Sequence, residues 1–424
     1  MSFQTGLSGL NASSRNLDVI GNNIANANTI GMKSSRVEYA DIVASSLGTA
    51  GGGGGGIGVS VATVSQQFSQ GSINITGNDL DVAINGGGFF QLTLPDGSSS
   101  YTRDGQFKLD KSGNIITNAG AKVLGYKIDA TGNPIVGAKP TPLQLPTAAP
   151  IAASATTSIT AEFNLDARAN LAAGVPAVPF SAGPPIVAAV AAIPATPRTT
   201  YGTSLTTFDS QGATVPVSLY FERVASTTTD NWDVFDSASG GTALFQMQFD
   251  ANGTLTSPLP GAAALTLNIA TPSAVTPNIS ATLDISKVTQ YGSAFAVSNL
   301  AQDGYASGDL VGVKIGENGV ITASYSNGQK QAAGQVALAD FRNVQGLVPT
   351  GGGTWAATSA SGDAVDGSPG LGKFGSLRSG ALEESNVDLT AELVNMMTAQ
   401  RAYQANAQTI KTQDQAMTTL VNLR

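Results

Sequence analysis

The two ends of the chain share one pattern, in which apolar residues recur alternately three and four positions apart. In the first segment this spacing selects Phe3, Leu7, Leu10, Ser14, Leu17, Gly21 and Ile24. In the last segment it selects Leu389, Leu393, Met396, Gln400, Tyr403, Ala407, Ile410, Asp414, Met417 and Val421. The spacing predicts two amphipathic helices, each with one stripe that can pack along another helix as in a coiled coil. The residues Ser-Asn-Val-Asp at 385–388 predict the start of the second helix.

Both helices are expected to be weak on their own. The surface of the first is mostly Asn, Ser, Gly and Thr, which are poor helix formers, and its charged residues are Arg15 and Asp18. An isolated helix of this length is marginal in water, so we expect the chain ends to be disordered until a partner covers them. The spacing does not reveal whether that partner is the other end of the same chain or many further copies.

Between the helices the pattern changes to the alternation of apolar and polar residues that is typical of half-buried strands. Clear examples are 79–84, 215–221, 245–249 and 311–315. Turns of the form Asp-x-x-Gly occur within 109–114, 128–133, 208–213 and 249–254, and a related Glu-Asn-Gly turn occurs at 317–319. In such turns the side chain bonds its own backbone and Gly supplies a positive φ, which predicts hairpins. The predicted fold class is therefore multidomain, with terminal α-helices forming a coiled coil and nested antiparallel all-β domains between them.

Two kinds of stretch predict connections. The glycine run at 48–58 has almost no side chains to pack, and it lacks the Gly-Lys-Ser/Thr ending of a phosphate-binding loop. The stretches at 146–158 and 171–198 are rich in Pro and Ala. They predict the entry to a central insertion and a long loop within it.

The composition excludes several kinds of chemistry. The chain has no histidine and no cysteine, which excludes imidazole catalysis, disulfides and thiolate metal sites. The net charge of −8 argues against nucleic acid as a partner. No apolar run approaches the roughly 20 residues that span a bilayer. The N-terminus lacks the basic and apolar regions of a secretory signal peptide.

One pair of carboxylates could still support an enzyme or bind a cation. Asp79 and Asp81 lie two positions apart in an alternating segment, which would place them on one strand face about 7 Å apart. The alternation alone explains both residues. We therefore predict no catalytic, cofactor or metal site, and we expect that the protein is not an enzyme.

Several stretches resemble the flagellar rod and hook axial protein family. NLDVIGNNIANANTIGMKSSR resembles the N-terminal signature of that family, and LDVAINGGGFFQL and YTRDGQFKLDKSGNI resemble its core β domain. GALEESNVDLTAELVNMMTAQRAYQANAQTIKTQDQ resembles the C-terminal signature of its hook members. The stretches occur in the family's order. One departure is Met32, where the family usually has an aromatic residue.

The resemblance implies a structural subunit of the bacterial flagellar hook. Copies would self-assemble into a flexible curved tube that joins rod to filament and transmits torque. Further implied partners are the rod, hook-cap and hook–filament junction proteins and the flagellar export apparatus, without nucleic acid, cofactor or membrane insertion. The implied location is extracellular, in the hook, after export without a cleaved signal peptide. Two alternatives are a distal rod subunit of the same family and a secreted adhesin or carboxylate enzyme.

The resemblance also implies a nested domain order. Residues 1–27 with 383–424 would form the coiled-coil domain, and 28–70 with 362–382 would bridge it to a core β domain of 71–145 and 299–361. Residues 146–298 would form an outer β domain inserted in the core domain. Assembly contacts are expected at Leu7, Leu10, Leu17, Ile24, Leu389, Leu393, Met396, Tyr403, Ile410 and Met417. Bridging contacts are expected at Asn28, Gly31, Lys33 and Arg36. Both cations are expected to face an adjacent subunit or the chain's own bridging segment, or else to lie at a local surface turn.

Overall fold

The chain divides into two compact units. The computed structural model describes residues 2–43, 56–129, 135, 139–146, 150–178, 191–226, 229–258, 265–272 and 275–422. Unit 1 comprises Met1–Ala149, Val311–Ser324 and Lys330–Arg424, and unit 2 comprises Pro150–Leu310 and Tyr325–Gln329. Parts of four predicted connections and turns lie outside the described residues, namely 48–55, 130–133, 147–149 and 179–190.

Unit 1 contains both helices and most of the strands. The helices are α1 (Ser2–Ala25) and α2 (Leu389–Asn422). Its strands before the insertion are β1 (Ser35–Val43), β2 (Gly56–Gln66), β3 (Ile73–Ile75), β4 (Val82–Asn85), β5 (Phe89–Thr93), β6 (Ser99–Thr102), β7 (Phe107–Leu109), β8 (Ile115–Thr117), β9 (Lys122–Tyr126) and β10 (Thr141–Pro142). Those after it are β21 (Leu310–Ile315), β22 (Val320–Tyr325), β23 (Lys330–Val336), β24 (Leu338–Asp340), β25 (Val348–Gly351), β26 (Thr354–Ala356), β27 (Val365–Gly367), β28 (Ser376–Ser379) and β29 (Ala381–Glu383).

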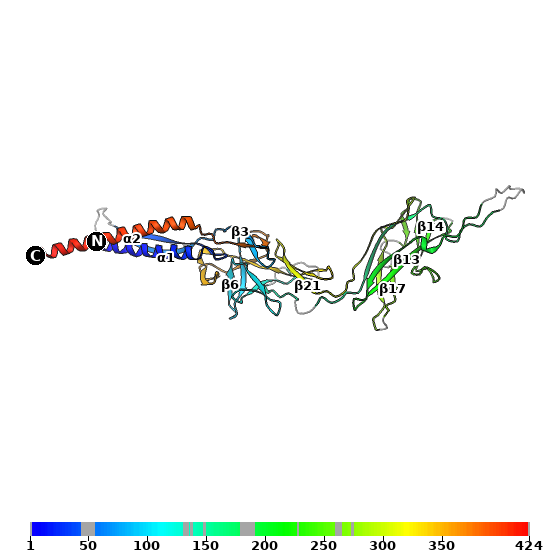
Figure 1. Cartoon of the computed structure of the whole chain (residues 1–424), viewed down its shortest axis with the longest axis horizontal. Helices are drawn as coiled ribbons and strands as arrows, with labels where there is room; N and C mark the ends of the chain where they lie inside the picture. The colour runs from blue at the N-terminus through cyan, green and yellow to red at the C-terminus, as the bar shows by residue number, and fades with distance from the viewer. Residues whose placement is uncertain are drawn as a thin grey trace. The chain divides into compact units, whose positions relative to one another are not determined.

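The two helices pack against each other and run antiparallel, with the chain termini at the same end of unit 1 (Figure 1). Asp388 caps α2, because its Oδ1 accepts hydrogen bonds from the backbone N–H groups of Thr390 (2.9 Å) and Ala391 (3.1 Å). Asn23 near the end of α1 bonds Glu392 near the start of α2. In the part of the chain that the structure describes, neither helix has the length and hydropathy of a membrane span.

Small residues, not leucines, make the closest contacts between the helices. A Cβ atom on Gly9 would lie 2.9 Å from Asn406 Nδ2, and one on Gly6 would lie 3.2 Å from Ile410 Cγ1. The predicted stripe of α1 is therefore wrong by about one residue as an intrachain contact. Leu7 is 44% exposed, whereas the buried positions of α1 are Gly6, Ala12, Ile20 and Asn23. Glycine allows backbones to approach more closely than leucine does, which rotates the contacting face.

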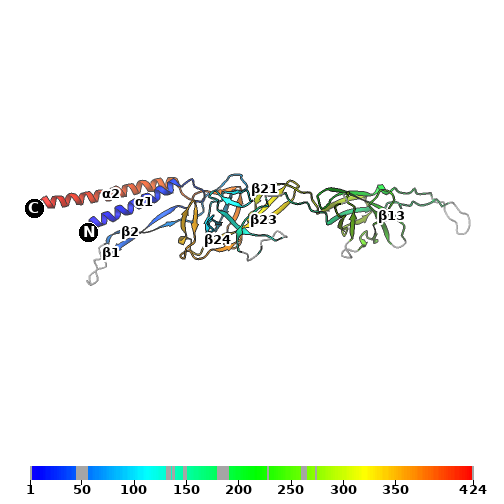
Figure 2. The ribbon, with the colours of Figure 1, turned by 90° about the horizontal axis from the view of Figure 1, so that it is seen from below.

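The hairpin of β1 and β2 covers a second side of α1 (Figure 2). Ser8 Oγ accepts a hydrogen bond of 3.3 Å from the backbone N–H of Val59, and Tyr39 Oη donates one of 3.5 Å to the carbonyl of Ala12. The same chain thus supplies α1 with two partners, whereas most of α2 stays exposed.

The β core of unit 1 is a sheet of 13 strands with an aromatic cluster. Its central path runs β21-β22-β23-β9-β5-β6-β26-β25. Phe89, Tyr101, Phe341 and Trp355 are buried and meet edge to face, at ring-centroid distances of 4.7 to 6.0 Å. The predicted alternation fails in β4, where Val82, Ala83 and Ile84 are all buried because both faces of this strand are covered.

Unit 2 contains two five-stranded sheets that share one hydrophobic core. One sheet has the order β12-β13-β14-β15-β16, from β12 (Gly202–Phe208), β13 (Thr214–Val224), β14 (Asp230–Phe235), β15 (Phe245–Phe249) and β16 (Leu255–Ser257). The other combines β11 (Ser158–Asp166), β17 (Thr266–Ile269), β18 (Ile279–Asp284), β19 (Thr289–Tyr291) and β20 (Ala296–Gln302). Trp232, Phe221, Phe249 and Leu165 fill the core and are fully or almost fully buried.

The prediction of purely antiparallel sheets is wrong at one strand. β11 pairs in parallel with β18 and with β19. Parallel neighbours need a long crossover between them, and here the five strands of the other sheet form that crossover.

The predicted hairpin turns are confirmed where the structure describes them. The side chains of Asp110, Asp209 and Asp250 each accept two backbone N–H bonds within their own turns. The following glycines, Gly113, Gly212 and Gly253, have φ between 76° and 82°.

We expect Gly9→Val to weaken the packing of α1 against α2. The new side chain meets Asn406, and overpacking of this kind costs about 1–3 kcal/mol. Gly21→Val is the matched control, because a Cβ on Gly21 meets nothing within 4 Å. Thermal unfolding followed by circular dichroism at a helix wavelength should show a lower midpoint for Gly9→Val alone. Equal midpoints for the two variants would contradict the close approach.

Candidate functional site

Three segments distant in sequence converge where the helices leave the β core of unit 1. We call this region, formed by residues 31–35, 67–72 and 381–386, the joint. Its backbone bonds join all three segments: Gly31 N–H donates to Glu383 O (2.8 Å), Gln67 N–H to Ser34 O (2.8 Å) and Glu384 N–H to Ser72 O (2.8 Å). The joint therefore holds the segment that follows α1 against the segment that precedes α2.

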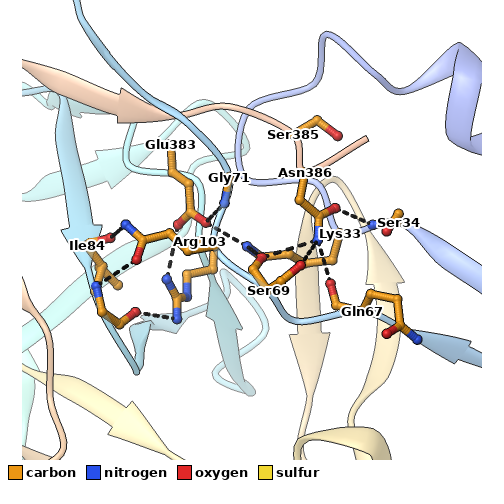
Figure 3. Close-up of polar contacts among 12 residues, drawn as sticks. Lys33, Ser34, Gln67, Ser69, Gly71, Ile84, Arg103, Glu383, Ser385 and Asn386 are labelled. Carbon is orange, nitrogen blue, oxygen red and sulfur yellow. Dashed lines mark hydrogen bonds and ion pairs between the residues drawn. The ribbon is translucent and has the colours of Figure 1, made fainter. Parts of the chain in front are cut away.

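A buried carboxylate lies at the centre of the joint and serves two cations. Figure 3 shows Lys33 and Arg103 converging on Glu383. Lys33 Nζ lies 2.6 Å from Glu383 Oε1, and Arg103 Nη1 lies 3.0 Å from Glu383 Oε2. The side chains of Lys33 and Glu383 are 0% exposed and that of Arg103 is 6% exposed. Charges so fully removed from water persist only when they are paired and hydrogen-bonded.

Backbone groups complete the hydrogen bonding of this cluster. Glu383 Oε1 also accepts the N–H of Gly71 (3.0 Å), and Lys33 Nζ donates to the carbonyl of Ser69 (2.7 Å). Arg103 Nη2 donates to the carbonyl of Gly86 (3.0 Å), and its guanidinium lies 5.2 Å from the ring centroid of Phe89. Within the described residues the buried Arg103 Nε has no hydrogen-bond partner.

Burial dominates the protonation of Lys33. Removal from water lowers the pKa of its ammonium below the usual value, and the nearby Glu383 carboxylate only partly opposes that shift. The pair is thus an internal structural contact. Both oxygens of Glu383 and the ammonium of Lys33 are engaged in bonds within the chain.

Two asparagines extend the joint toward the helices. Asn386 accepts a bond of 2.7 Å from Ser34 N–H and donates one of 2.7 Å to the carbonyl of Gln67 (Figure 3). Asn23 on α1 accepts a bond of 2.9 Å from Ser35 N–H and donates one of 2.8 Å to the Ser35 carbonyl. Each asparagine side chain therefore both accepts a hydrogen bond from a backbone N–H group and donates one to a backbone carbonyl, as a neighbouring strand would.

The four predicted bridging residues have different environments. Gly31 has φ +69°, and a Cβ there would lie 2.7 Å from Arg103 C, so both conformation and space require glycine. Lys33 is in the joint, where it bonds Ser69 of the predicted bridging segment and pairs with the buried Glu383. Of the expected environments for Lys33, the surface and the subunit interface are wrong. Arg36 is 66% exposed at its side chain and pairs with Glu38, and Asn28 is exposed.

Sequence reasoning missed Glu383, Arg103, Asn23 and Asn386. A weak signal exists for one of them, since Glu383 directly follows the apolar pair Ala381–Leu382 in a short strand. A carboxylate next to two apolar residues in a strand suggests a buried partner, but Glu384 follows directly and the sequence does not say which carboxylate is buried or that its partner is 350 residues away.

The residues expected at assembly contacts are mostly accessible in the single chain. Leu7, Leu389, Leu393, Tyr403 and Met417 are 37% to 64% exposed. Leu10, Leu17, Ile24, Met396 and Ile410 are half-buried. Their role in contacts between copies remains a prediction.

Of the two carboxylates considered for catalysis, Asp81 has a local structural role. Asp81 accepts hydrogen bonds from Thr76 Oγ1 (2.7 Å) and Asn78 Nδ2 (3.2 Å) within one turn, and Asp79 lies in that turn rather than on a strand. Among the described residues no group of three or more acidic side chains could hold a metal ion.

We expect Glu383→Gln to destabilise unit 1 more than Lys33→Met does. Removing the carboxylate leaves two buried cations without a counter-ion, which costs about 3–5 kcal/mol. Removing the ammonium leaves Glu383 paired with Arg103 and bonded to Gly71 N–H, so its cost should be about 1–3 kcal/mol. Denaturant unfolding of the full chain measures both. Arg36→Ala is the control and should change little, since that pair is exposed. A larger loss for Lys33→Met would refute the central role of Glu383.

The lowered pKa of Lys33 predicts a dependence of stability on pH. Between that lowered pKa and 10.5 the unfolded chain binds more protons at this residue than the folded chain does. The free energy of unfolding should therefore rise with pH across this window. The measurable quantity is the difference between the wild type and Lys33→Met, followed by urea unfolding from about pH 7 to about pH 10. A difference that is flat or falls with pH would speak against the burial of this ammonium.

Family models match most of the chain in the order of the fold. The models described as "Flagella basal body rod protein" and "Flagellar hook protein FlgE/F/G D1 domain" match residues 3–33 and 83–162. Those described as "Flagellar basal body protein FlaE D2 domain" and "Flagellar basal body rod FlgEFG protein C-terminal" match residues 164–305 and 378–423. The two terminal matches each contain one half of the Lys33–Glu383 pair.

Curated relatives match over the whole length. The chain is 42% identical to flagellar hook protein FlgE of Escherichia coli (strain K12) over 435 residues, covering 100% of both chains. It is 42% identical to that of Salmonella typhimurium over 439 residues, again covering 100% of both. It is 32% identical to that of Rhizobium meliloti, covering 100% of this chain and 98% of the relative.

A solved structure agrees at the level of the fold. The crystal structure of Helicobacter pylori flagellar hook protein FlgE2 aligns with a TM-score of 0.51 and 16% identity, covering 73% of this chain and 100% of that chain. Full-length identity together with the ordered domain matches shows that this chain belongs to the flagellar hook protein FlgE family.

Proposed function

We propose that this structural subunit of the flagellar hook assembles with its own copies into a flexible curved tube that joins rod to filament and transmits torque. In this proposal α1 and α2 form a coiled-coil inner layer, and the β parts of the chain lie outside it. The neighbours of the tube would be other flagellar axial proteins, namely the rod, hook-cap and hook–filament junction proteins. Subunits would reach this extracellular location through the flagellar export apparatus, without a cleaved signal peptide.

The observation that carries the proposal is an exposed apolar ridge on α2. Leu389, Leu393 and Met397 lie four residues apart on one side of the helix and are 42%, 51% and 53% exposed. Burying such a side chain contributes about 1.5–3 kcal/mol. A helix 34 residues long with this ridge uncovered gains that stability only when another molecule covers it.

The low charge of the helices suits packing against many identical copies. α1 carries one cation and one anion among its 24 residues, Arg15 and Asp18. Like charges brought together by rotational symmetry repel one another, and uncharged polar side chains avoid that repulsion. We further propose the division into a helical part, a bridging part, a core part and an outer part along the boundaries expected from the sequence.

The alternatives have less support. The curated relatives matched over their full length are hook proteins, and the insertion that a distal rod subunit is expected to lack is present as unit 2. Of the two carboxylates that would have served an enzyme, Asp81 accepts hydrogen bonds within a local turn.

We expect Leu393→Asp to impair assembly while leaving the monomer folded. The side chain is half exposed, so the charge costs little in the single chain, but it opposes burial between copies. A loss of about 1.5–3 kcal/mol per contact raises the critical concentration for polymerisation by roughly tenfold or more. Sedimentation of the polymer and negative-stain microscopy measure this effect.

Leu393→Met is the matched control, because it keeps the apolar volume and should assemble as the wild type does. Unchanged polymerisation of Leu393→Asp would show that this ridge is not an assembly contact.

A further inference from the structure

We propose that Asn23 and Asn386 are positioning residues that fix the direction of α1 and α2 relative to the β core of unit 1. The helices and the β core then move as one rigid body, instead of being joined by a flexible hinge. This inference rests on the proposed function, because a tube transmits torque only if its inner and outer layers turn together.

The connections between the helices and the β core are long enough to act as hinges. Between the last residue of α1, Ala25, and the first residue of β1, Ser35, lie the nine residues 26–34. Between the end of β29, Glu383, and the start of α2, Leu389, lie the five residues 384–388. A flexible connection of nine residues spreads its ends over roughly 15 Å. Some contact must therefore fix the angle.

Asn23 connects α1 to both of its neighbours. Its Oδ1 accepts from Ser35 N–H (2.9 Å), and its Nδ2 donates to the Ser35 carbonyl (2.8 Å) and to Glu392 Oε1 on α2 (3.2 Å). The residue is 1% exposed. One buried side chain thus links the end of α1, the first residue of β1 and the first turn of α2.

Asn386 makes the corresponding contacts two residues before the cap of α2. Its Oδ1 accepts from Ser34 N–H (2.7 Å), and its Nδ2 donates to the carbonyls of Gln67 (2.7 Å) and Ser69 (3.2 Å) and to Ser69 Oγ (3.0 Å). The adjacent residues Ser34 and Ser35 are therefore held from two sides, by one asparagine from each helical end of the chain.

At the two connections themselves, the contacts that fix the angle are mainly polar bonds. A cavity of about 380 Å³ lies beside the two connections and is lined by Ala27, Asn28, Ile30, Ser385, Val387 and other residues. The apolar side chains that line this cavity leave it unfilled, so packing is incomplete beside the connections. The Glu383 cluster holds the three segments together, but neither of its cations lies on a helix.

The chain offers a clean experiment because it contains no cysteine. Two cysteines, Gln400→Cys on α2 and Lys122→Cys on β9, are both placed at exposed positions and carry spin labels in the full-length monomer. Pulsed electron paramagnetic resonance then gives the distribution of distances between the helix and the core. We expect a narrow distance distribution in the parent, the labelled protein that carries only the two cysteines. When Asn23→Ala/Asn386→Ala is added to it, we expect the distances to spread over on the order of 10 Å.

Asn28→Ala is the matched control, since Asn28 is an exposed asparagine in the same connection, and it should leave the distribution narrow. The unfolding midpoint of the β core should change little in the double alanine variant and in Asn28→Ala. A broadened distance distribution would then report a change in the direction of the helices and not a loss of stability. If the alanine variant loses its core, Asn23→Asp/Asn386→Asp decides the matter, because aspartate keeps each acceptor oxygen and loses the amide donors.

A broadened distribution with an intact core supports the proposal. An unchanged distribution in the alanine variant, or in the aspartate variant if the alanine variant loses its core, overturns it. Microscopy of the same preparations tests the proposed function separately. A parent protein that never forms tubes would contradict the hook assembly while leaving the distance measurement valid.

Discussion

The structure of unit 1 depends on one buried carboxylate. Glu383 bonds Lys33 from the N-terminal segment, Arg103 from the β core and the backbone of Gly71, so a single side chain joins four stretches of chain. The ion pairs are strong in this water-free environment because all three charged side chains are present. Removing one of them leaves a buried charge without a partner, and the cost of its desolvation is then no longer offset. Closing the joint is therefore a cooperative event that needs both ends of the chain.

The helices illustrate how close packing can override an apolar pattern. Leucines at alternate three- and four-residue steps suggest one face, but Gly6 and Gly9 allow a closer approach on the neighbouring face. On α1 the predicted stripe residue Leu7 is left 44% exposed, and on α2 the apolar residues Leu389, Leu393 and Met397 are exposed as well. This exposed apolar surface is what the proposed contacts between copies would cover.

Unit 2 and the β core are built on more local rules. Asp110, Asp209 and Asp250 each close a hairpin through bonds to their own backbone, and the glycine that follows supplies the left-handed conformation. Turns of this kind could be predicted because all their contacts lie within six residues. The parallel pairing of β11 could not be predicted, since it joins strands separated by an entire sheet.

The sequence by itself determined the two terminal helices, the β character of the region between them, the hairpin turns and the membership of the hook family. These features depend on spacing, turn chemistry and ordered motifs that are contained within short windows. Only the tertiary structure decided which face of α1 meets α2, and that Lys33 is an interior cation paired with Glu383. It also decided that Asn23 and Asn386 hold the same two residues of the chain. The contact of Lys33 with Glu383 joins residues 350 positions apart and that of Asn23 with Glu392 joins residues 369 positions apart, and no local pattern encodes which distant side chain will meet another.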